Sequence, residues 1–405
     1  MCILYRHSRA GDNVSVSGNG RLPLEGVLVL DLTRAVAGPF GTMLLGDLGA
    51  RVIKIEEPDR GDETRYWGPP FLGDWSTYFL SINRNKESVA LDLKSAAGRR
   101  AVQRIAARAD VVVENFRPGV MDRLGLGLAE LARRNPRLIY ASISDFGQTG
   151  PDRGKAGYDL IIQGMSGLMR ASAGPDEEAV KVAFPVSDIL TSLFAGQAIL
   201  ASLYSREKDG RGRYIEVSLL EGMLSAMCSL VTGTLLTGQE PERVGTAQHN
   251  IVPYQMFHCR DAPIVFGSPN ERLWQRLCEA LEHPQWLEDP RFQGNAARNQ
   301  HRAELVGEME AVLRTRPAAH WLERLERCEV PCGPVCSISE ALSLPQVAAR
   351  GTVVECDHAE LGRLRLVGNP MRMAGTPFAY RAPPGLGEHT QAVMQEFFPG
   401  EPEES

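Results

Sequence analysis

The chain has 405 residues, with 44 Lys and Arg against 50 Asp and Glu, which gives a formal net charge of −6. This length is two to three times that of a typical domain, so we expect two domains. The 43% content of hydrophobic residues excludes a wholly disordered or fibrous protein. The acidic balance argues against a dedicated nucleic-acid-binding protein. No apolar run reaches the roughly 18 residues that would indicate a membrane span.

The eight cysteines include no Cys-x-x-Cys pair. Cys328, Cys332 and Cys336 are evenly spaced, but prolines between them break any helix that would align them as metal ligands. We therefore expect no metal site and reduced thiols, as in a cytoplasmic protein. Residues 1–22 lack an apolar signal core and predict a loose tail. The expected compartment is the cytoplasm, or the mitochondrial matrix if the protein is eukaryotic.

Strand-like and helix-like segments alternate through the first half of the chain. Apolar, β-branched runs at 26–33, 51–56, 88–93, 110–114, 138–144 and 213–217 predict strands, and helical spacing predicts helices over 35–49, 95–109, 120–134, 188–205 and 219–236. This alternation predicts an α/β protein whose large, Rossmann-like domain has a mostly parallel sheet with helices on both faces.

The texture of the sequence changes after this region. A short strand at 264–266 precedes amphipathic helices at 273–281 and 302–313, which predict a smaller α+β domain, and segments 351–356 and 361–367 resemble a β pair. We predict the following division: a tail over 1–22, a large domain over 23–224, a linker over 225–244, the small domain over 245–330, a second linker over 331–345, and a return to the large domain with a C-terminal tail over 346–405.

The first strand–helix–strand unit could bind a dinucleotide, and Glu56 or Glu57 lies about where a ribose-binding carboxylate would. However, the turn after its first strand, residues 34–39, is not the Gly-x-Gly-x-x-Gly motif. The sequence therefore disfavours a nicotinamide site, although the helix N-terminus could still receive a phosphate.

Asp188 is the only charged or histidine side chain between Ala183 and Tyr204. It follows Ser187 at the expected start of an apolar helix. One interpretation is an N-cap, which contributes about 1 kcal/mol. The other is a carboxylate that the helix dipole keeps ionised as a nucleophile. Asp159 also precedes an apolar helix, so a capping role is open there too.

Other polar residues allow a functional and a plain structural interpretation. Residues 115–119 follow a predicted strand at the position where open α/β sheets bind ligands, but a simple turn is the alternative. Lys94 and Arg123 could pair with phosphates or could be solvated surface charges. The eight histidines form no His-x-x-x-His pair, which argues against metal catalysis.

Nine short motifs in the right order resemble the family III CoA-transferases, the group that contains formyl-CoA and carnitine CoA-transferases. They are Leu30–Thr33 with Ala37–Pro39, Gly46–Ala50 with Val52–Glu56, Asn85–Lys86, Leu91–Lys94, Glu114–Gly119, Gly147–Pro151 with Gly157–Asp159, Val252–Gln255, Val330–Pro334 and Leu386–Thr390. The resemblance covers about residues 23–395. Segments Arg65–Phe71, Gly245–Ala247 and Ile251–Gln255 look most similar to the succinate–hydroxymethylglutarate CoA-transferase branch.

The resemblance implies a reaction and a site. CoA would pass from an acyl-CoA, expected to be succinyl-CoA, to a small carboxylic acid, expected to be a dicarboxylate. Asp188 would be the nucleophile, through aspartyl anhydride and aspartyl-CoA thioester intermediates, with the Asp159 carboxylate near it. The family's CoA contacts match Val36, Ala37, Leu91, Lys94, Asn115, Phe116, Arg117, Arg123, Lys155 and Tyr158. The resemblance also implies an interlocked homodimer and no metal or nicotinamide cofactor.

Two departures from the family pattern matter. Glu57 stands where the family often has an arginine, which puts one phosphate contact in doubt. Val36 stands where formyl-CoA transferases have glutamine, and their glycine-rich loop is absent, so we disfavour formyl or oxalyl specificity.

Two other activities remain as alternatives. An α-methylacyl-CoA racemase on the same fold typically has histidine at the position of Tyr158, and the tyrosine removes that proton shuttle. A non-catalytic CoA-binding protein is the second alternative. Small-domain residues would select the acid, and the candidates are Arg243, Gln248, His249 and Tyr254.

Overall fold

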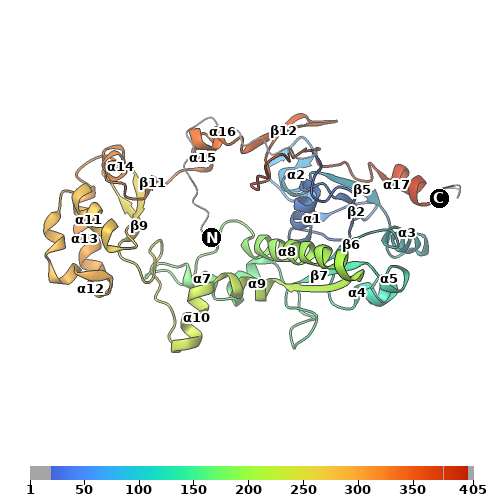
Figure 1. Cartoon of the computed structure of the whole chain (residues 1–405), viewed down its shortest axis with the longest axis horizontal. Coiled ribbons are helices and arrows are strands. Elements are labelled where there is room, and N and C mark those ends of the chain that lie inside the picture. Colours follow the sequence, from blue (N-terminus) through green and yellow to red (C-terminus); the bar gives the residue numbers. More distant parts are fainter. Residues whose placement is uncertain (1–19, 377, 400–405) are drawn as a thin grey trace. The chain divides into compact units, whose positions relative to one another are not determined.

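The structure, a computed structural model, describes residues 20–376 and 378–399, so most of the predicted N-terminal tail and the acidic tail from Gly400 lie outside the described residues. The chain forms two compact units (Figure 1). The first contains the described residues up to Gln163, Ala183–Ala226, and the described residues from Ala349 onward. The second contains Gly164–Val182 and Met227–Ala348.

A six-stranded sheet, parallel throughout, organises the first unit, as the alternation of elements predicted. Its strands are β1 (Leu28–Asp31), β2 (Arg51–Glu56), β5 (Lys86–Ala90), β6 (Val111–Glu114), β7 (Ile139–Ser144) and β8 (Arg213–Ser218). Their spatial order is β5-β2-β1-β6-β7-β8. Counting only these strands along the chain, the order is 3-2-1-4-5-6, which is that of a Rossmann fold and reverses direction between β1 and β6.

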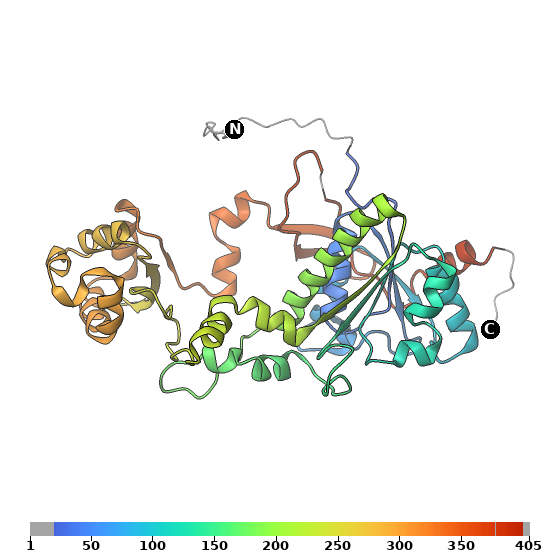
Figure 2. The ribbon, with the colours of Figure 1, turned by 60° about the horizontal axis from the view of Figure 1, so that its bottom comes forward.

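Helices cover both faces of this sheet, and the central strands β1, β6 and β7 are therefore buried on both sides. On one face α1 (Ala37–Asp47) and α8 (Val186–Asp209) pack side by side, as Figures 1 and 2 show. The other face packs against α3 (Ala96–Ala106), α4 (Val120–Leu124), α5 (Leu128–Arg134) and α17 (Thr390–Phe397) in one apolar core. The remaining elements of this unit are η1 (Glu63–Tyr66), β3 (Phe71–Leu72), β4 (Trp75–Ser76), α2 (Thr77–Ile82), α9 (Leu219–Ala226), β12 (Val353–His358) and β13 (Gly362–Val367). Helix α6 (Asp159–Met165) begins in this unit and ends in the second.

The second unit has its own core of apolar and aromatic side chains, beneath a three-stranded antiparallel sheet of order β11-β10-β9. The sheet strands are β9 (Tyr254–His258), β10 (Pro263–Gly267) and β11 (Cys332–Pro334). The helices are α7 (Leu168–Ala171), α10 (Cys228–Thr237), α11 (Glu271–Ala280), η2 (Pro284–Leu287), η3 (Pro290–Phe292), α12 (Gly294–Gln300), α13 (Arg302–Leu313), α14 (Ala318–Arg327), α15 (Ile338–Leu342) and α16 (Pro345–Ala349). The small α+β fold expected from the sequence is therefore present.

Two predicted helices are each divided into two. The helix expected over 120–134 stops at Gly125, which adopts φ 69° as the C-cap of α4. The helix expected over 219–236 becomes α9 and α10, which meet at an angle of 83° near Cys228. Apolar periodicity continues across both breaks, so periodicity alone did not reveal them.

Helix α8 begins earlier than the sequence suggested. Its N-cap is Pro185, and Asp188 is the third residue of the helix. The N-cap interpretation of Asp188 is therefore wrong. Of the described helices, α8 alone is long and apolar enough to cross a membrane by length and composition, a test that buried core helices also pass. Here α8 packs against α1, α9 and the sheet.

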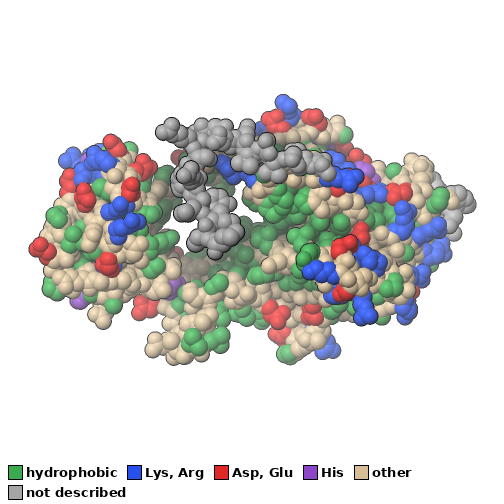
Figure 3. Space-filling view, in the orientation of Figure 1, with side chains coloured by type: hydrophobic (Ala, Val, Ile, Leu, Met, Phe, Trp, Pro, Cys, Tyr) green, Lys and Arg blue, Asp and Glu red, His purple; other side chains and the backbone are tan. Residues whose placement is uncertain are grey.

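Part of the surface of the first unit is rich in basic side chains, although the whole chain has a net acidic charge. On the face shown in Figure 3, Lys and Arg side chains gather over the right-hand part of that unit, with Asp and Glu among them. Helices α3 and α5 lie in that part of Figure 1 and carry the exposed arginines Arg100, Arg104, Arg133 and Arg134. This basic surface belongs to the helix layer and not to the residues that the sequence assigned to the site.

Candidate active site

The candidate site lies where the sheet reverses its strand order. The turn after β1 and the loop after β6 meet there because β1 and β6 are neighbours. The Arg34 backbone N–H donates to Asn115 Oδ1 at 2.9 Å, and Asn115 Nδ2 donates to the Arg34 carbonyl at 2.8 Å. This reciprocal pair joins the two loops at the position where open α/β sheets bind their ligands.

The turn after β1, residues 32–36, has an unusual backbone. Ala35 adopts φ 59°, a left-handed conformation that costs free energy for a residue with a Cβ. Gly38 follows in the first turn of α1, where an added Cβ would lie 2.2 Å from the Thr33 Cβ. The result is a tight approach of strand end and helix start, and the Ala37 N–H at this start lies near the Asp188 carboxylate and favours its ionised form.

Asp188 lies between the N-terminal turns of two helices. It is in the first turn of α8, and the Ala37 N–H that it accepts is at the start of α1. The Ser192 hydroxyl lies 2.7 Å from the Asp188 carbonyl and also contacts the Ala37 carbonyl, so it joins the two helices. The positive ends of both helix dipoles therefore face this carboxylate, as an ionised nucleophile requires.

The acidity of Asp188 is set by opposing influences. Burial and, to a smaller extent, the negative charges of Asp159 and Asp145 together raise the pKa of Asp188 to about 7, although the Ala37 N–H acts in the opposite direction. Asp145 was not recognised in the sequence, because it follows β7, far along the chain from Asp188. A carboxylate with such a pKa is about half ionised at neutral pH and is basic enough to be a competent nucleophile.

Asp159 acts on Asp188 through the start of α8. Its Oδ1 accepts the Ser187 backbone N–H at 3.0 Å and the Ser187 hydroxyl at 2.8 Å, and its Oδ2 accepts from Gln163 Nε2 at 2.7 Å. Pro185, the N-cap of α8, makes no side-chain capping bond. Asp159 therefore caps a helix other than its own and fixes the residue next to Asp188.

Asp188 opens onto a cavity of about 250 Å³, which we call the small cavity. Of the expected site residues, Val36, Ala37, Asn115, Phe116, Arg117, Lys155, Tyr158 and Asp188 line it. Arg34, Asp145 and Arg153 also line it, although the sequence gave no reason to assign them to the site. The guanidinium groups of Arg34, Arg117 and Arg153 and the ammonium of Lys155 make this cavity suited to anionic groups.

A second cavity of about 730 Å³, the large cavity, shares Arg34, Glu63 and Phe116 with the small one. The expected residues Leu91 and Lys94 line it. Its other lining residues are Leu32, Ile55, Glu56, Glu57, Arg60, Gly61, Tyr66, Trp67, Asp92 and Leu93. The apolar and aromatic side chains suit a large ligand with an aromatic base. The lining also contains three cations, which could pair with phosphate groups, and four carboxylates, Glu56, Glu57, Glu63 and Asp92.

Arg123 and Glu57 differ from the other residues that the sequence assigned to the CoA site. Arg123 is exposed on α4 and is not among the residues that line either cavity in the described part of the chain. Glu57 lines the large cavity, but its Oε2 accepts the Arg60 backbone N–H at 2.9 Å. This turn brings Arg60 into the cavity lining next to Glu57.

The four residues suggested for acid selection lie in the second unit. The Arg243 guanidinium donates to the Glu177 carbonyl, and Arg302 Nη2 donates to the carbonyls of Gln248 and His249, each at 2.9 Å. Tyr254 is half exposed at the end of β9. Arg302 therefore bonds to the backbone of Gln248 and His249 and not to their side chains.

The fold and the site define an α/β enzyme with a partly buried carboxylate at the strand-order switch point and a nucleotide-sized cavity beside it. The family model of CoA-transferase family III matches residues 24–390. The chain belongs to CoA-transferase family III and is a CoA-transferase. The resemblance drawn from nine short motifs is confirmed.

Relatives with printed activities support this assignment. A succinyl-CoA:glutarate CoA-transferase of Mus musculus is 41% identical, covering 92% of this chain and 86% of that protein. An acetyl-CoA:oxalate CoA-transferase of Acetobacter aceti is 42% identical, covering 93% of this chain and 96% of that protein. The crystal structure of a CAIB/BAIF family protein from Brucella suis matches with a TM-score of 0.82 at 35% identity, covering 93% of this chain and 100% of that one.

Proposed function

We propose that this enzyme transfers CoA from succinyl-CoA to a dicarboxylate acceptor through covalent intermediates on Asp188. The observation that carries the proposal is the Asp188 carboxylate, which receives the Ala37 N–H and lines a cavity that shares residues with the nucleotide-sized one. A thioester carbonyl at the junction of the cavities would therefore lie within reach of this carboxylate while the rest of the CoA occupies the large cavity.

In the first half-reaction, Asp188 attacks the thioester carbonyl carbon of the donor. The new C–O bond forms a mixed anhydride, and the C–S bond breaks with its electron pair on the CoA thiolate. The thiolate then attacks the Asp188 carbonyl carbon, which forms an aspartyl-CoA thioester and releases the donor acid as its carboxylate. No net proton transfer is needed, so the site requires no general acid.

In the second half-reaction, the acceptor carboxylate attacks the aspartyl thioester carbonyl and displaces the thiolate. The thiolate attacks the acceptor carbonyl of the new anhydride, and Asp188 leaves as a carboxylate. The bond energy of the thioester is retained throughout. Water would hydrolyse the anhydride, so the partial burial of Asp188 serves the transfer.

The charges of the small cavity favour acids that carry a second carboxylate. Arg117 and Arg153 line it together with Asp188, and a second carboxylate on the acceptor would give these guanidinium groups an anionic partner. Glutarate and oxalate, the acceptors in the names of the two relatives above, are both dicarboxylates. Val36 disfavours oxalate in our sequence interpretation, so we propose a longer dicarboxylate, and an acceptor screen from oxalate to glutarate tests that choice.

We further propose that the enzyme is a homodimer of interlocked chains. The chain leaves the first unit after Ala226 and returns to it at Ala349, as a ring threaded by a partner requires. Leu235, Leu236 and Ile338 are 79%, 81% and 82% exposed in the single chain, which leaves apolar surface for a second chain to cover. Sedimentation analysis should give twice the monomer mass; a monomer at micromolar concentration would contradict the proposal.

The intact mass of the protein after incubation with succinyl-CoA tests the covalent chemistry. We expect an adduct with the mass of a CoA thioester, and hydroxylamine should convert it to a hydroxamate on the peptide that contains Asp188. The Asp188→Ala variant should form neither product. An unmodified wild-type protein that still binds CoA would contradict the proposal, and deuterium uptake at the α-carbon of a 2-methylacyl-CoA would then indicate the racemase.

Adduct formation should depend on pH through the ionisation of Asp188. Burial raises the pKa of Asp188 to about 7, and only the ionised carboxylate attacks. The single-turnover rate should therefore rise about tenfold per pH unit below pH 7 and reach a plateau above it. Quenched-flow measurement of the adduct between pH 5 and 9 checks this, and a rate already constant at pH 5 would contradict it.

Lys94→Ala should weaken the binding of the acyl-CoA. The ammonium lines the large cavity, where it pairs with a phosphate in the proposed complex, so we expect the KM for succinyl-CoA to rise about tenfold with little change in kcat. Lys208→Ala is the matched control, because Lys208 lies over the Tyr204 ring on α8 and lines neither cavity. Equal KM values in the two variants would exclude this role for Lys94.

A further inference from the structure

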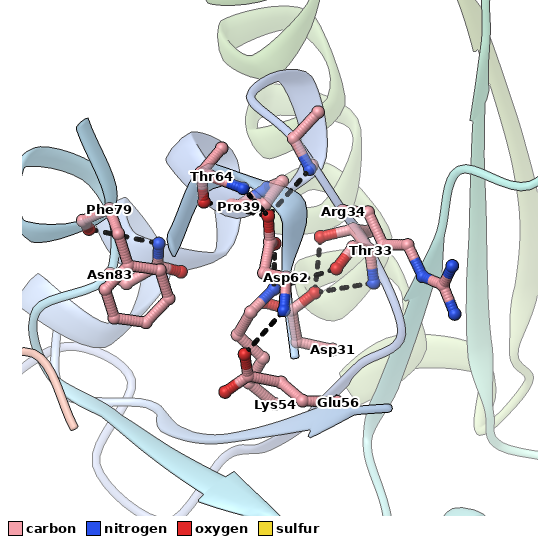
Figure 4. A network of polar contacts seen from close by, with 12 residues as sticks. Asp31, Thr33, Arg34, Pro39, Lys54, Glu56, Asp62, Thr64, Phe79 and Asn83 are labelled. Carbon is pink, nitrogen blue, oxygen red and sulfur yellow. Dashed lines mark hydrogen bonds and ion pairs between the residues drawn. The ribbon is translucent and has the colours of Figure 1, made fainter. Parts of the chain in front are cut away.

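A network of buried charges lies directly behind the turn of residues 32–36 (Figure 4). Its members are Asp31, Glu56, Asp62, Lys54, Lys86 and Arg65. Both groups of the Lys54–Asp62 pair are fully buried, at 2.8 Å, and so are both groups of the Lys86–Asp31 pair, at 3.0 Å. Three acids balance three bases. Burying a pair of charges costs desolvation free energy that their attraction offsets only with good geometry and further hydrogen bonds.

The network holds the turn by its backbone. Lys54 Nζ donates to the Thr33 carbonyl at 2.8 Å, and the Ala35 N–H donates to Asp62 Oδ1 at 3.3 Å. The same Asp62 oxygen accepts the Thr64 N–H at 2.9 Å, while Asp62 Oδ2 accepts from Lys54. One buried ion pair therefore bonds to the backbone of the turn on both sides of Arg34.

Ala35, which bonds to Asp62, is also the residue with the strained backbone. Ala35 has the left-handed φ of 59°, and the Asp62 carboxylate accepts its N–H. Two residues further on, Ala37 is the first residue of α1, and its N–H donates to the nucleophile. A change in the conformation of Ala35 would therefore redirect the N–H that Asp188 receives.

We propose that the Lys54–Asp62 pair positions the nucleophile: it holds Ala35 in its left-handed conformation and so aims the Ala37 N–H at the Asp188 carboxylate. This inference rests on the proposed function, because it assigns the pair a role in the reaction of Asp188. Neither Lys54 nor Asp62 contacts the reacting atoms in the proposed reaction. The pair acts through the turn, and its charge also neutralises the interior on which the turn rests.

The reaction rate as a function of pH reports on this role. If the Ala37 N–H no longer reaches Asp188, the pKa of Asp188 rises, because the ionised carboxylate has lost a hydrogen-bond donor. Most other ionisable groups near Asp188 belong to other elements: Asp159 on α6, Asp145 after β7, Tyr78 on α2, and the cavity residues Arg117, Arg153 and Lys155. The exceptions are Arg34, which belongs to the turn itself, and Glu63, which directly follows Asp62.

The direction of the shift separates positioning from simple electrostatics. Removing the negative charge of Asp62 would by itself favour the ionised form of Asp188 and lower its pKa. Loss of the aimed N–H acts in the opposite direction. The double variant Lys54→Met with Asp62→Ala removes one charge of each sign, so its electrostatic effect is small and the positioning effect remains.

The experiment measures single-turnover adduct formation from succinyl-CoA between pH 5 and 9 in the full-length enzyme. For Asp62→Ala and for the double variant we expect the midpoint of the rising limb to move up by about one pH unit. The double variant leaves no unpaired buried charge, so it carries the test if Asp62→Ala does not fold.

Asp47 provides the matched control. It is buried and pairs with Arg84 at 2.7 Å in the same unit, but it lies at the far end of α1. Asp47→Ala, or Arg84→Met with Asp47→Ala, should lower the melting temperature and leave the midpoint unchanged.

Two results would overturn the inference: an unchanged or lowered midpoint in the Asp62 variants, or an equal upward shift in the Asp47 variants. Failure of the proposed function is distinguishable, because then the wild-type enzyme itself would form no adduct.

Discussion

Asp188→Asn is expected to lower the rate of CoA exchange between succinyl-CoA and its acceptor at least about a thousandfold. The amide cannot form the anhydride, and no other carboxylate in the described part of the small cavity receives the Ala37 N–H. The geometry should otherwise persist, because the amide oxygen can still accept that N–H. Exchange of radiolabelled succinate into succinyl-CoA measures the effect.

The same variant should be more stable than the wild-type enzyme at alkaline pH. Burial raises the pKa of Asp188 to about 7, while an unfolded aspartate has a pKa of about 3.9. The folded state therefore binds more protons than the unfolded state between about pH 4 and 7. Across this window the free energy of unfolding of the wild type falls as pH rises, and above it the loss is complete.

The size of this stabilisation follows from the shift. Three pH units correspond to about 4 kcal/mol, and the partial exposure of Asp188 reduces this to on the order of 2 kcal/mol at pH 8. The difference between Asp188→Asn and wild type should vanish near pH 4. Urea unfolding at the two pH values checks it. An Asp188→Asn enzyme that is inactive and less stable than wild type at pH 8 would instead indicate a structural role for Asp188. Asp188→Ala is a second control, because deamidation of the asparagine in Asp188→Asn would regenerate the aspartate and restore activity, which cannot happen in the alanine variant.

Gly38→Ala should be the most damaging small substitution near the site. The added methyl would lie 2.2 Å from Thr33 Cβ and 2.4 Å from its Oγ1. Thr33 cannot move aside, because it is fully buried and donates to Asp31 through both its N–H and its hydroxyl. Helix α1 must move instead, and it carries the Ala37 N–H away from Asp188.

We expect Gly38→Ala to lower the free energy of unfolding by about 1–3 kcal/mol and the exchange rate about a hundredfold, the typical effect of a displacement of about 1 Å at a reacting group. Gly307→Ala on α13 is the matched control, since its Cβ would meet no atom within 4 Å; it should leave exchange unchanged and slightly increase stability. A Gly38→Ala enzyme with wild-type exchange would show that the packing of α1 on Thr33 does not control the site.

Much of the large domain could be predicted because its determinants are local. Strand β2 was predicted with its observed bounds, and β1, β6, β7 and β8 to within two residues at each end, since short β-branched runs between turn residues define strands directly. Strand β5 was predicted over 88–93 but spans Lys86–Ala90, and its early start was missed because Lys86, which is buried, looks like a surface residue in the sequence.

The candidate nucleophile could be singled out, but its environment could not. Asp188 is conspicuous as the one charge in an apolar segment, which is a property of the sequence. The caps and partners around it come from remote segments: Asp159 precedes Ser187 by 28 residues, and Asn115 follows Arg34 by 81. No periodicity or motif links such positions, so the cavity residues Arg34, Asp145 and Arg153 were missed.

The sequence by itself determined the order of strands and helices and the class of the fold, and it singled out Asp188 as the candidate nucleophile, because these follow from side-chain patterns along short segments and from motifs. The tertiary structure decided which charges are buried and which face the ligand. Lys54 and Asp62 resemble ordinary polar residues of a strand and a turn, yet both are fully buried and bond to the backbone of the turn after β1. Burial depends on what the rest of the chain packs against each residue, and only the folded chain brings those distant segments together.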